Sequence, residues 1–152
     1  MKRACLLLSA VLVGCTPGAS GGGTQAPSSL SGVTTIDINL SRDAGVLTQA
    51  GAGGGYAPIP VVVPVGTRFR FVNTDGFAHT ATAIGGTQFP SALPFTDDAL
   101  TQRGSMLSQA WTTGALDAGS SSQIFVADQP GVYIFGCFFH YGAPMRGVII
   151  VE

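Results

Sequence analysis

The sequence predicts an all-β fold, an antiparallel β-sandwich of about seven to eight strands. Short segments alternate apolar and polar residues with the period of a half-buried strand. In segment 67–73, Phe69 and Phe71 share one face while Arg68 and Arg70 share the other. Turns rich in Gly and Pro separate these segments. The 22 Gly residues also disfavour a helix bundle, because Gly weakens helix interiors.

The individual elements follow from the same pattern, taken along the chain. Segment 44–57 is Gly-rich and is expected to be a loop, and 85–107 is irregular, with a short helical turn near 97–102. Met106 and Trp111 are core candidates. The expected strands are 34–40, 59–63, 67–73, 79–84, 108–113, 121–127, 132–137 and 146–151.

The N-terminus carries the features of a targeting signal. Lys2 and Arg3 precede an apolar run over 4–13, which is too short to span a bilayer. The run ends in Leu12-Val13-Gly14-Cys15, which resembles the lipobox of bacterial lipoproteins. This resemblance implies a signal peptide over 1–14 and lipid on Cys15, and hence a domain anchored in the cell envelope, in the periplasm or at the extracytoplasmic face. The alternative is an ordinary signal peptide that contains two Cys.

A tether and a single domain are expected after the signal. Residues 15–32 are rich in Gly, Ser, Pro and Thr and predict a flexible tether, with a reach of about 20–25 Å. The domain then covers 33–152. Without residues 1–14, five scattered Arg face eight acidic residues, a formal charge of −3. This distribution argues against nucleic-acid binding, which requires clustered Lys and Arg.

Cysteine and histidine are scarce in the expected domain. Cys137 is the only Cys after Cys15, and His79 and His140 are the only two His. An unpaired thiol in an oxidising compartment needs burial or a metal to protect it. Two His and one Cys with a weak, distant Met are the ligands of blue-copper centres. We therefore expect one copper ion held by His79, Cys137 and His140, with Met145 as a weak axial ligand.

The spacing of these residues suits such a site. Segment 132–137 would deliver Cys137 at a strand end, and the following loop would return His140 and Met145 before the last strand. His79, 58 positions before Cys137, would join the loop to the rest of the fold, so that metal binding depends on folding. Taken singly, Cys137 could be a small core residue, either His a structural one, and Met145 core filler. Their joint occurrence favours the metal site.

Two motifs resemble those of the cupredoxins, in particular the plastocyanin, pseudoazurin and amicyanin branch. They are Phe71-Val72-Asn73-x-x-Gly76-Phe77-Ala78-His79 and Cys137-x-x-His140-x4-Met145. The resemblance covers about 33–152, and the end of the chain, Met145 to Val151, resembles that of amicyanin. It implies a Greek-key sandwich with a type 1 Cu(II)/Cu(I) site and an apolar patch near His140 where redox partners dock.

The chain also departs from the family pattern. Thr80 stands where plastocyanins often have an Asn that braces the loop near the sulfur, and Thr can still donate a hydrogen bond. The spacer Phe138-Phe139 contains no Pro, and the segment between His79 and Cys137 is longer than in plastocyanin. No ligand is lost by these differences.

The expected function is that of a monomeric, lipid-anchored carrier of single electrons, not an enzyme. A copper storage or delivery lipoprotein could use the same ligands. A Cys–His nucleophile would need an orienting group and an oxyanion hole, for which the sequence has no motif. Multicopper oxidases and nitrite reductases need further His ligands. A structural adhesion sandwich, indifferent to copper, is the remaining alternative.

Overall fold

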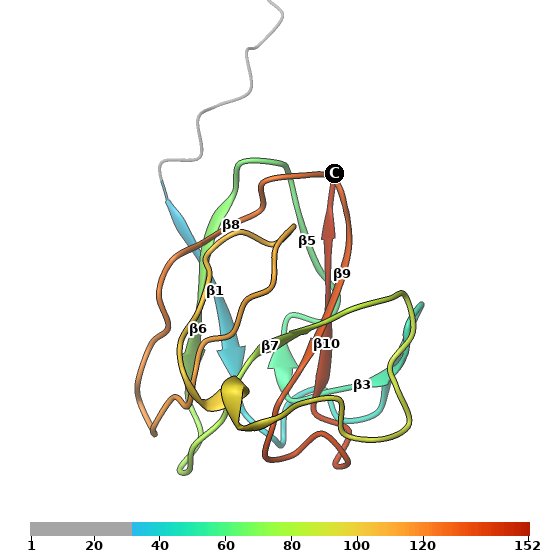
Figure 1. Cartoon of the computed structure of the whole chain (residues 1–152), viewed down its shortest axis with the longest axis vertical. Helices are drawn as coiled ribbons and strands as arrows, with labels where there is room; N and C mark the ends of the chain where they lie inside the picture. Colours follow the sequence, from blue (N-terminus) through green and yellow to red (C-terminus); the bar gives the residue numbers. More distant parts are fainter. Residues whose placement is uncertain (1–31) are drawn as a thin grey trace, which may run out of the picture.

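The computed structural model describes residues 32–152 (Figure 1). The predicted signal peptide (1–14), Cys15 and the tether up to residue 31 lie outside the described residues. None of the described helices is long and apolar enough to cross a membrane. The described elements are β1 (Val33–Ile38), β2 (Val46–Thr48), β3 (Gly51–Gly53), β4 (Tyr56–Ala57), β5 (Val61–Val63), β6 (Arg68–Asn73), β7 (Thr82–Ile84), the 3₁₀ helix η1 (Asp97–Leu100), β8 (Phe125–Val126), β9 (Gly131–Gly136) and β10 (Arg146–Val151).

Two four-stranded sheets form the sandwich within residues 32–152. Their strand orders are β4-β1-β6-β8 and β5-β10-β9-β7, and β2 pairs with β3 in a separate hairpin. From β4 to β9, consecutive strands lie in alternate sheets, which is the crossing pattern of Greek-key sandwiches. The predicted all-β sandwich of about eight strands is confirmed. Two pairs, β1 with β6 and β5 with β10, are parallel, so the sheets are mixed.

The core lies between the two sheets and is largely aromatic. Phe69 and Phe71 of β6 are buried and Arg68 and Arg70 are exposed, as the alternation predicts. Trp111 is buried as expected and stacks on Phe71 at a centroid distance of 5.9 Å. Such rings bury a large apolar area each. The core therefore fixes the two sheets against each other with few, large side chains.

Three sequence predictions, about segments 44–57 and 108–113 and about Met106, are wrong. Segment 44–57 is not a loop but contains β2, β3 and β4. Segment 108–113 forms only isolated bridges through Thr112, whose hydroxyl donates to the carbonyl of Ala99 and accepts from the N–H of Gly114. Side-chain bonds and isolated bridges therefore hold this segment, and no strand ladder forms there. Met106 is exposed, not buried in the core.

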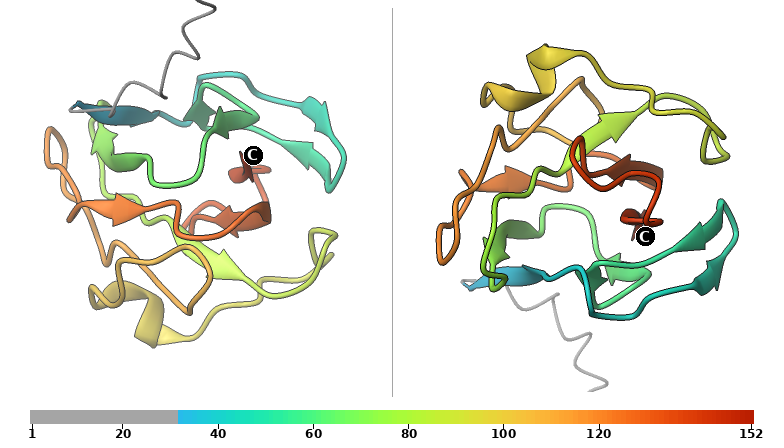
Figure 2. Two further views of the ribbon diagram at one scale, coloured as in Figure 1. Left: turned by 90° about the horizontal axis from the view of Figure 1, so that it is seen from above. Right: turned by 90° about the horizontal axis from the view of Figure 1, so that it is seen from below.

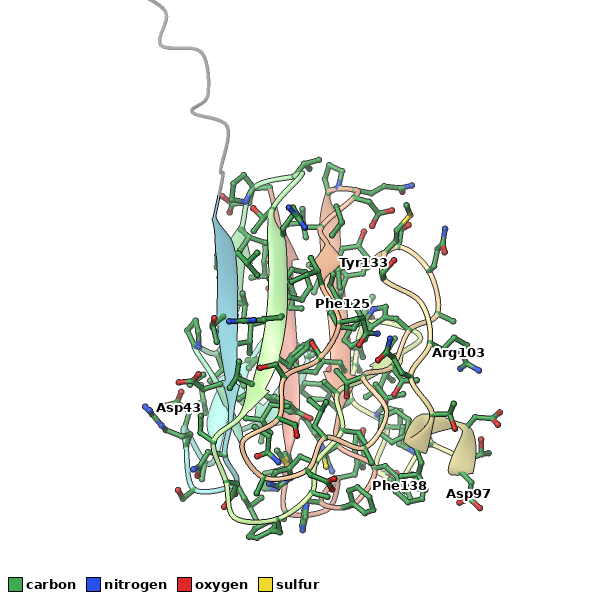
Figure 3. The ribbon with its side chains drawn as sticks, turned by 90° about the vertical axis from the view of Figure 1, so that its left-hand side faces the viewer. Asp43, Asp97, Arg103, Phe125, Tyr133 and Phe138 are labelled. Atoms are coloured by element: carbon green, nitrogen blue, oxygen red, sulfur yellow. The ribbon has the colours of Figure 1, made fainter. Side chains whose placement is uncertain are left out.

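The two ends of the sandwich hold different parts of the chain. The C-terminus and the start of β1 lie at one end, and the loop between β9 and β10 lies at the other (Figure 1). Figure 3 shows Phe138 of that loop near one end and Tyr133 of β9 towards the opposite end. The predicted ligand loop thus lies far from where the chain enters the domain.

Candidate metal centre

Cys137 directly follows the central strand β9. This strand pairs with β10 on one side and β7 on the other, so its end is held from both sides. The backbone N–H of Cys137 donates to the carbonyl of Met145 at 3.0 Å. The Cys137 side chain has no exposed surface. The thiol is therefore fixed in position by the sheet, as the sequence predicts.

His140 is returned towards Cys137 by a tight turn. The carbonyl of His140 accepts the N–H of Ala143 at 2.9 Å and the N–H of Met145 at 3.2 Å. His140 keeps part of its surface exposed, in contrast to Cys137. This turn closes the loop between β9 and β10 and brings three of the four predicted ligands onto one short segment.

His79 lies between β6 and β7, and its ring approaches Cys137 from that segment. Its backbone pairs with Leu116 in both directions, at 3.1 and 2.8 Å. The His79 side chain is completely buried. The predicted strand 79–84 is shorter than expected, since β7 starts only at Thr82. A bridge and not a ladder therefore positions this His.

The three side chains form a cluster with the dimensions of a metal site. The sulfur of Cys137 lies 3.7 Å from Nδ1 of His79 and 3.8 Å from Nδ1 of His140. All three ligand atoms lie within 4.8 Å of one another. A metal about 2.3 Å from sulfur and 2.0–2.1 Å from nitrogen, as for zinc, keeps neighbouring trigonal ligands about 3.7 Å apart. The two sulfur–nitrogen distances therefore match those of a three-coordinate metal.

Met145 is joined to Cys137 through the backbone, since its carbonyl accepts the N–H of Cys137. Its side chain is fully buried and belongs to the same core as Cys137. Gly55 packs directly against it, because a Cβ on Gly55 would lie 2.5 Å from Cγ of Met145. Gly55 also has a φ of +76°, which favours Gly. Met145 is thus confined by backbone on one side, and its predicted role as an axial ligand stays a prediction.

Comparisons with known proteins identify the fold. No protein-family model matches the chain, and no curated protein sequence matches it. A Cu(I) form of an amicyanin variant is 16% identical, with a TM-score of 0.50 over 80% of this chain and 83% of that chain. The domain has the cupredoxin fold.

Two further solved structures are similar to this cupredoxin domain. A reduced amicyanin variant is 15% identical, with a TM-score of 0.50 over 80% of this chain and 84% of that one. A purple cupredoxin from Nitrosopumilus maritimus is 23% identical, with a TM-score of 0.49 over 78% of this chain and 99% of that one. At these identities the likeness concerns the fold.

Hydrogen bonds in the cupredoxin domain fix the His79 ring. Its Nε2 lies 3.1 Å from Oδ2 of Asp75, and Nδ1 faces the sulfur of Cys137. Burial lowers the pKa of His79, while the hydrogen bond that His79 donates to Asp75 acts in the opposite direction. The ring is therefore neutral at pH 7. With the proton on Nε2, the lone pair of Nδ1 is available to a metal.

A second set of contacts surrounds the sulfur. The N–H of Thr80 points at Sγ of Cys137 at 3.4 Å, and the Thr80 hydroxyl accepts the N–H of Phe138 at 2.8 Å. Thr80 thus braces the ligand loop, here with its side chain as acceptor. Burial raises the pKa of the Cys137 thiol. Without a metal the thiol is protonated at pH 7, and a bound cation would displace that proton.

Aromatic side chains lie around the partly exposed His140. The Phe77 ring lies 5.2 Å from the His140 ring, and that of Phe139 lies 6.3 Å away. Phe77 is 46% and Phe139 44% exposed, whereas Tyr141 is buried. Of the aromatics near the ligands in sequence, Phe77 and Phe139 are therefore the two most exposed, and we name this pair with His140 the aromatic patch.

Three residues that support the site were not found from the sequence. Asp75 fell on an unspecified position of the first motif, four residues before His79. Gly55 was part of the expected loop, although a run of Gly signals close backbone approach. Tyr56 donates its hydroxyl to the carbonyl of Thr80 at 2.6 Å and thereby holds the backbone beside the sulfur. No pattern in the chain pairs Tyr56 with Thr80, because the contact depends on the folded sandwich.

Proposed function

We propose that this protein binds one copper ion and carries single electrons. His79, Cys137 and His140 would be the strong ligands and Met145 the weak one. The single observation that carries this proposal is the cluster of one sulfur and two nitrogen atoms already at metal-binding separations. When bound, copper supplies the one-electron couple between Cu(II) and Cu(I).

The choice of copper rests on the donor set and the fold together. One thiolate, two imidazoles and a thioether are the donors of blue-copper electron-transfer sites. The similar amicyanin variant is described as a Cu(I) form, which agrees with this metal. Electron transfer needs a site that changes little between oxidation states. Ligands held by paired strands, buried packing and hydrogen bonds meet that need.

The aromatic patch is the proposed docking surface for redox partners. His140 is the ligand that retains exposed surface, and Phe77 and Phe139 flank it. Exposed aromatic side chains favour contact with another protein. An electron would therefore pass through the His140 ring with the partner seated on this patch. The domain would act as a monomer, tethered through Cys15 to a membrane of the cell envelope.

Copper storage or delivery is the second candidate function. A delivery protein exchanges its ligands with those of an acceptor, which requires access to them. The side chains of Cys137 and His79 are completely buried, so an acceptor could reach only His140. Burial of two strong ligands therefore favours retention of the metal and exchange of electrons. An enzymatic role is not proposed, since the fold and donor set match an electron carrier.

Voltammetry of the copper-loaded chain tests this function. A carrier should show a reversible one-electron wave over repeated cycles, with copper retained against a Cu(I) chelator at each reduction. The Cys137→Ser variant, which lacks the thiolate, should lose that wave. Loss of copper to the chelator on the first reduction would instead indicate storage or delivery.

A further inference from the structure

We propose that Asp75 is the positioning residue of the metal centre: it holds His79 as the tautomer that ligates and places a negative charge that favours Cu(II). The inference deepens the proposed function. Its statement about Cu(II) rests on that function, whereas its statement about the tautomer of His79 does not. Asp75 touches no predicted ligand atom and acts through the far side of the His79 ring.

The carboxylate of Asp75 accepts hydrogen bonds from three donors. Oδ2 accepts Nε2–H of His79 at 3.1 Å and the backbone N–H of Leu40 at 2.9 Å. Oδ1 accepts the N–H of Gly76 at 2.8 Å. The His79 side chain is 0% and the Asp75 side chain 17% exposed. The imidazole therefore depends on Asp75 for the partner of its second nitrogen, because a buried N–H without one is costly.

The position of Asp75 is itself fixed from two sides. Its N–H donates to Oδ1 of Asn73 at 2.9 Å. The amide of Asn73, which is fully buried, donates to the carbonyls of Phe77 and Leu116, both at 2.8 Å. Leu116 in turn pairs with the backbone of His79. Asn73, Asp75 and His79 thus form one connected unit between β6 and the bridge that positions the ligand.

The first consequence concerns the proton on His79. An ionised carboxylate can only accept hydrogen bonds, so Nε2 carries the proton and Nδ1 is left bare. Nδ1 is the atom that faces the Cys137 sulfur at 3.7 Å. A carboxylate on the other nitrogen of a ligating His fixes its tautomer and orientation and makes it a stronger base. Asp75 therefore prepares the ligand before any metal arrives.

The second consequence concerns the oxidation state. A negative charge one imidazole ring away from the metal stabilises Cu(II) more than Cu(I), because the former carries the larger positive charge. The partial burial of Asp75 limits screening by solvent. Asp75 should therefore lower the reduction potential of the centre.

Two variants separate the tautomer effect from the charge effect. Asp75→Asn removes the charge but keeps one acceptor oxygen. The N–H groups of His79 and Leu40 both favour the rotamer that turns this oxygen towards them. Asp75→Ala removes the charge and the acceptor together. Asp43→Asn is the matched control, since Asp43 is exposed and has a φ of 47°, which Asn tolerates.

The first readout needs no copper. ¹⁵N NMR of the imidazoles in the metal-free full chain should give the Nε2–H tautomer for His79 in the unsubstituted protein, in Asp75→Asn and in Asp43→Asn. Asp75→Ala should populate the Nδ1–H tautomer. Retention of pure Nε2–H in a folded Asp75→Ala variant would overturn the positioning role.

The second readout uses the copper-loaded chain at one fixed applied potential. Asp75→Asn should raise the ratio of Cu(I) to Cu(II) about tenfold, which corresponds to about 59 mV for one electron. A change no larger than that in Asp43→Asn would overturn the charge effect. If Asp75→Ala does not fold, the isosteric Asn variant still decides whether the charge of Asp75 affects the oxidation state. Failure of the unsubstituted protein to bind copper would refute the proposed function, and the NMR result would still decide the positioning role.

Discussion

Met145 packs against the backbone of Gly55 so closely that no side chain would fit between them. Gly55 can approach it because it has no Cβ, and the positive φ of Gly55 keeps the backbone in that position. A flexible Met side chain is otherwise adaptable. Here the backbone restricts it, which would keep a weak axial contact constant between the two oxidation states.

The Met145→Leu substitution tests the axial role. Leu has nearly the same volume, so the cost to stability should be below about 1.5 kcal/mol. Copper should remain bound by the three strong ligands, and the potential should rise because a donor to Cu(II) is lost. Voltammetry measures the shift, with Met106→Leu at an exposed position as control. An unchanged potential would contradict the axial role and leave Met145 with a packing role alone.

The cluster of His79, Cys137 and His140 could be predicted from the sequence because such donor types are rare in it. Cys137, His79 and His140 are almost the only soft or imidazole donors in the domain, and the structure brings all three together. Asp75 could not be predicted in the same way, since eight acidic residues offer no distinction in sequence. Its role depends on the turn after β6, which brings a carboxylate behind the His79 ring.

The loop between β9 and β10 is braced by the irregular segment that follows β7. The Tyr141 hydroxyl donates to the carbonyl of Pro90 at 2.8 Å, and its ring packs edge-on against Phe95. Arg146 donates to the Tyr141 carbonyl and places its guanidinium 4.2 Å from the Tyr141 ring centroid. The segment after β7 therefore supports the ligand loop from outside.

This support has a second part in the β2–β3 hairpin. The N–H of Phe89 donates to the carbonyl of Ala50, and Gly54 pairs with Arg146 in both directions. Figure 2 shows the hairpin and the segment after β7 projecting on the same side of the sandwich. The two segments thus meet each other and the start of β10.

Tyr141→Phe tests this brace. The loss of this partly buried hydrogen bond should lower the free energy of unfolding by about 1 kcal/mol. The amides of Ala143 and Met145, which bond to the His140 carbonyl, should exchange hydrogen faster. Tyr133→Phe is the matched control, because its hydroxyl bonds to Gln129 away from the site. Equal exchange at Ala143 and Met145 in the two variants would contradict a brace specific to the ligand loop.

The elements that could be predicted are those with a regular pattern and ladder pairing. The expected strands 67–73, 132–137 and 146–151 agree closely with β6, β9 and β10, and the helical turn near 97–102 agrees with η1. Segment 44–57 was misread because Gly lacks the side chains that make a strand pattern visible. The expected strand 108–113 has no regular alternation of apolar and polar residues, and the structure forms only isolated bridges there.

At the scale of the whole molecule, the start of β1 and the candidate metal centre lie at opposite ends of the sandwich (Figure 1). The chain enters at one end of the sandwich, and the ligand loop with the aromatic patch lies at the other (Figure 1). If Cys15 carries lipid, the sandwich would hold the metal centre away from the membrane, where partners can reach His140. The fold class could be predicted from strand pattern and turns, whereas the parallel pairs β1–β6 and β5–β10 could not, since they join segments distant in sequence.

Titration of the metal-free full chain with Cu(II), followed by visible absorption, tests the central claim most directly. An intense thiolate-to-copper band should grow and saturate at one equivalent, because Cys137, His79 and His140 already stand at ligand separations. The Cys137→Ser variant should show no such band. The absence of the band from the unsubstituted protein with its thiol still reduced, or its persistence in Cys137→Ser, would contradict a type 1 copper centre at these residues.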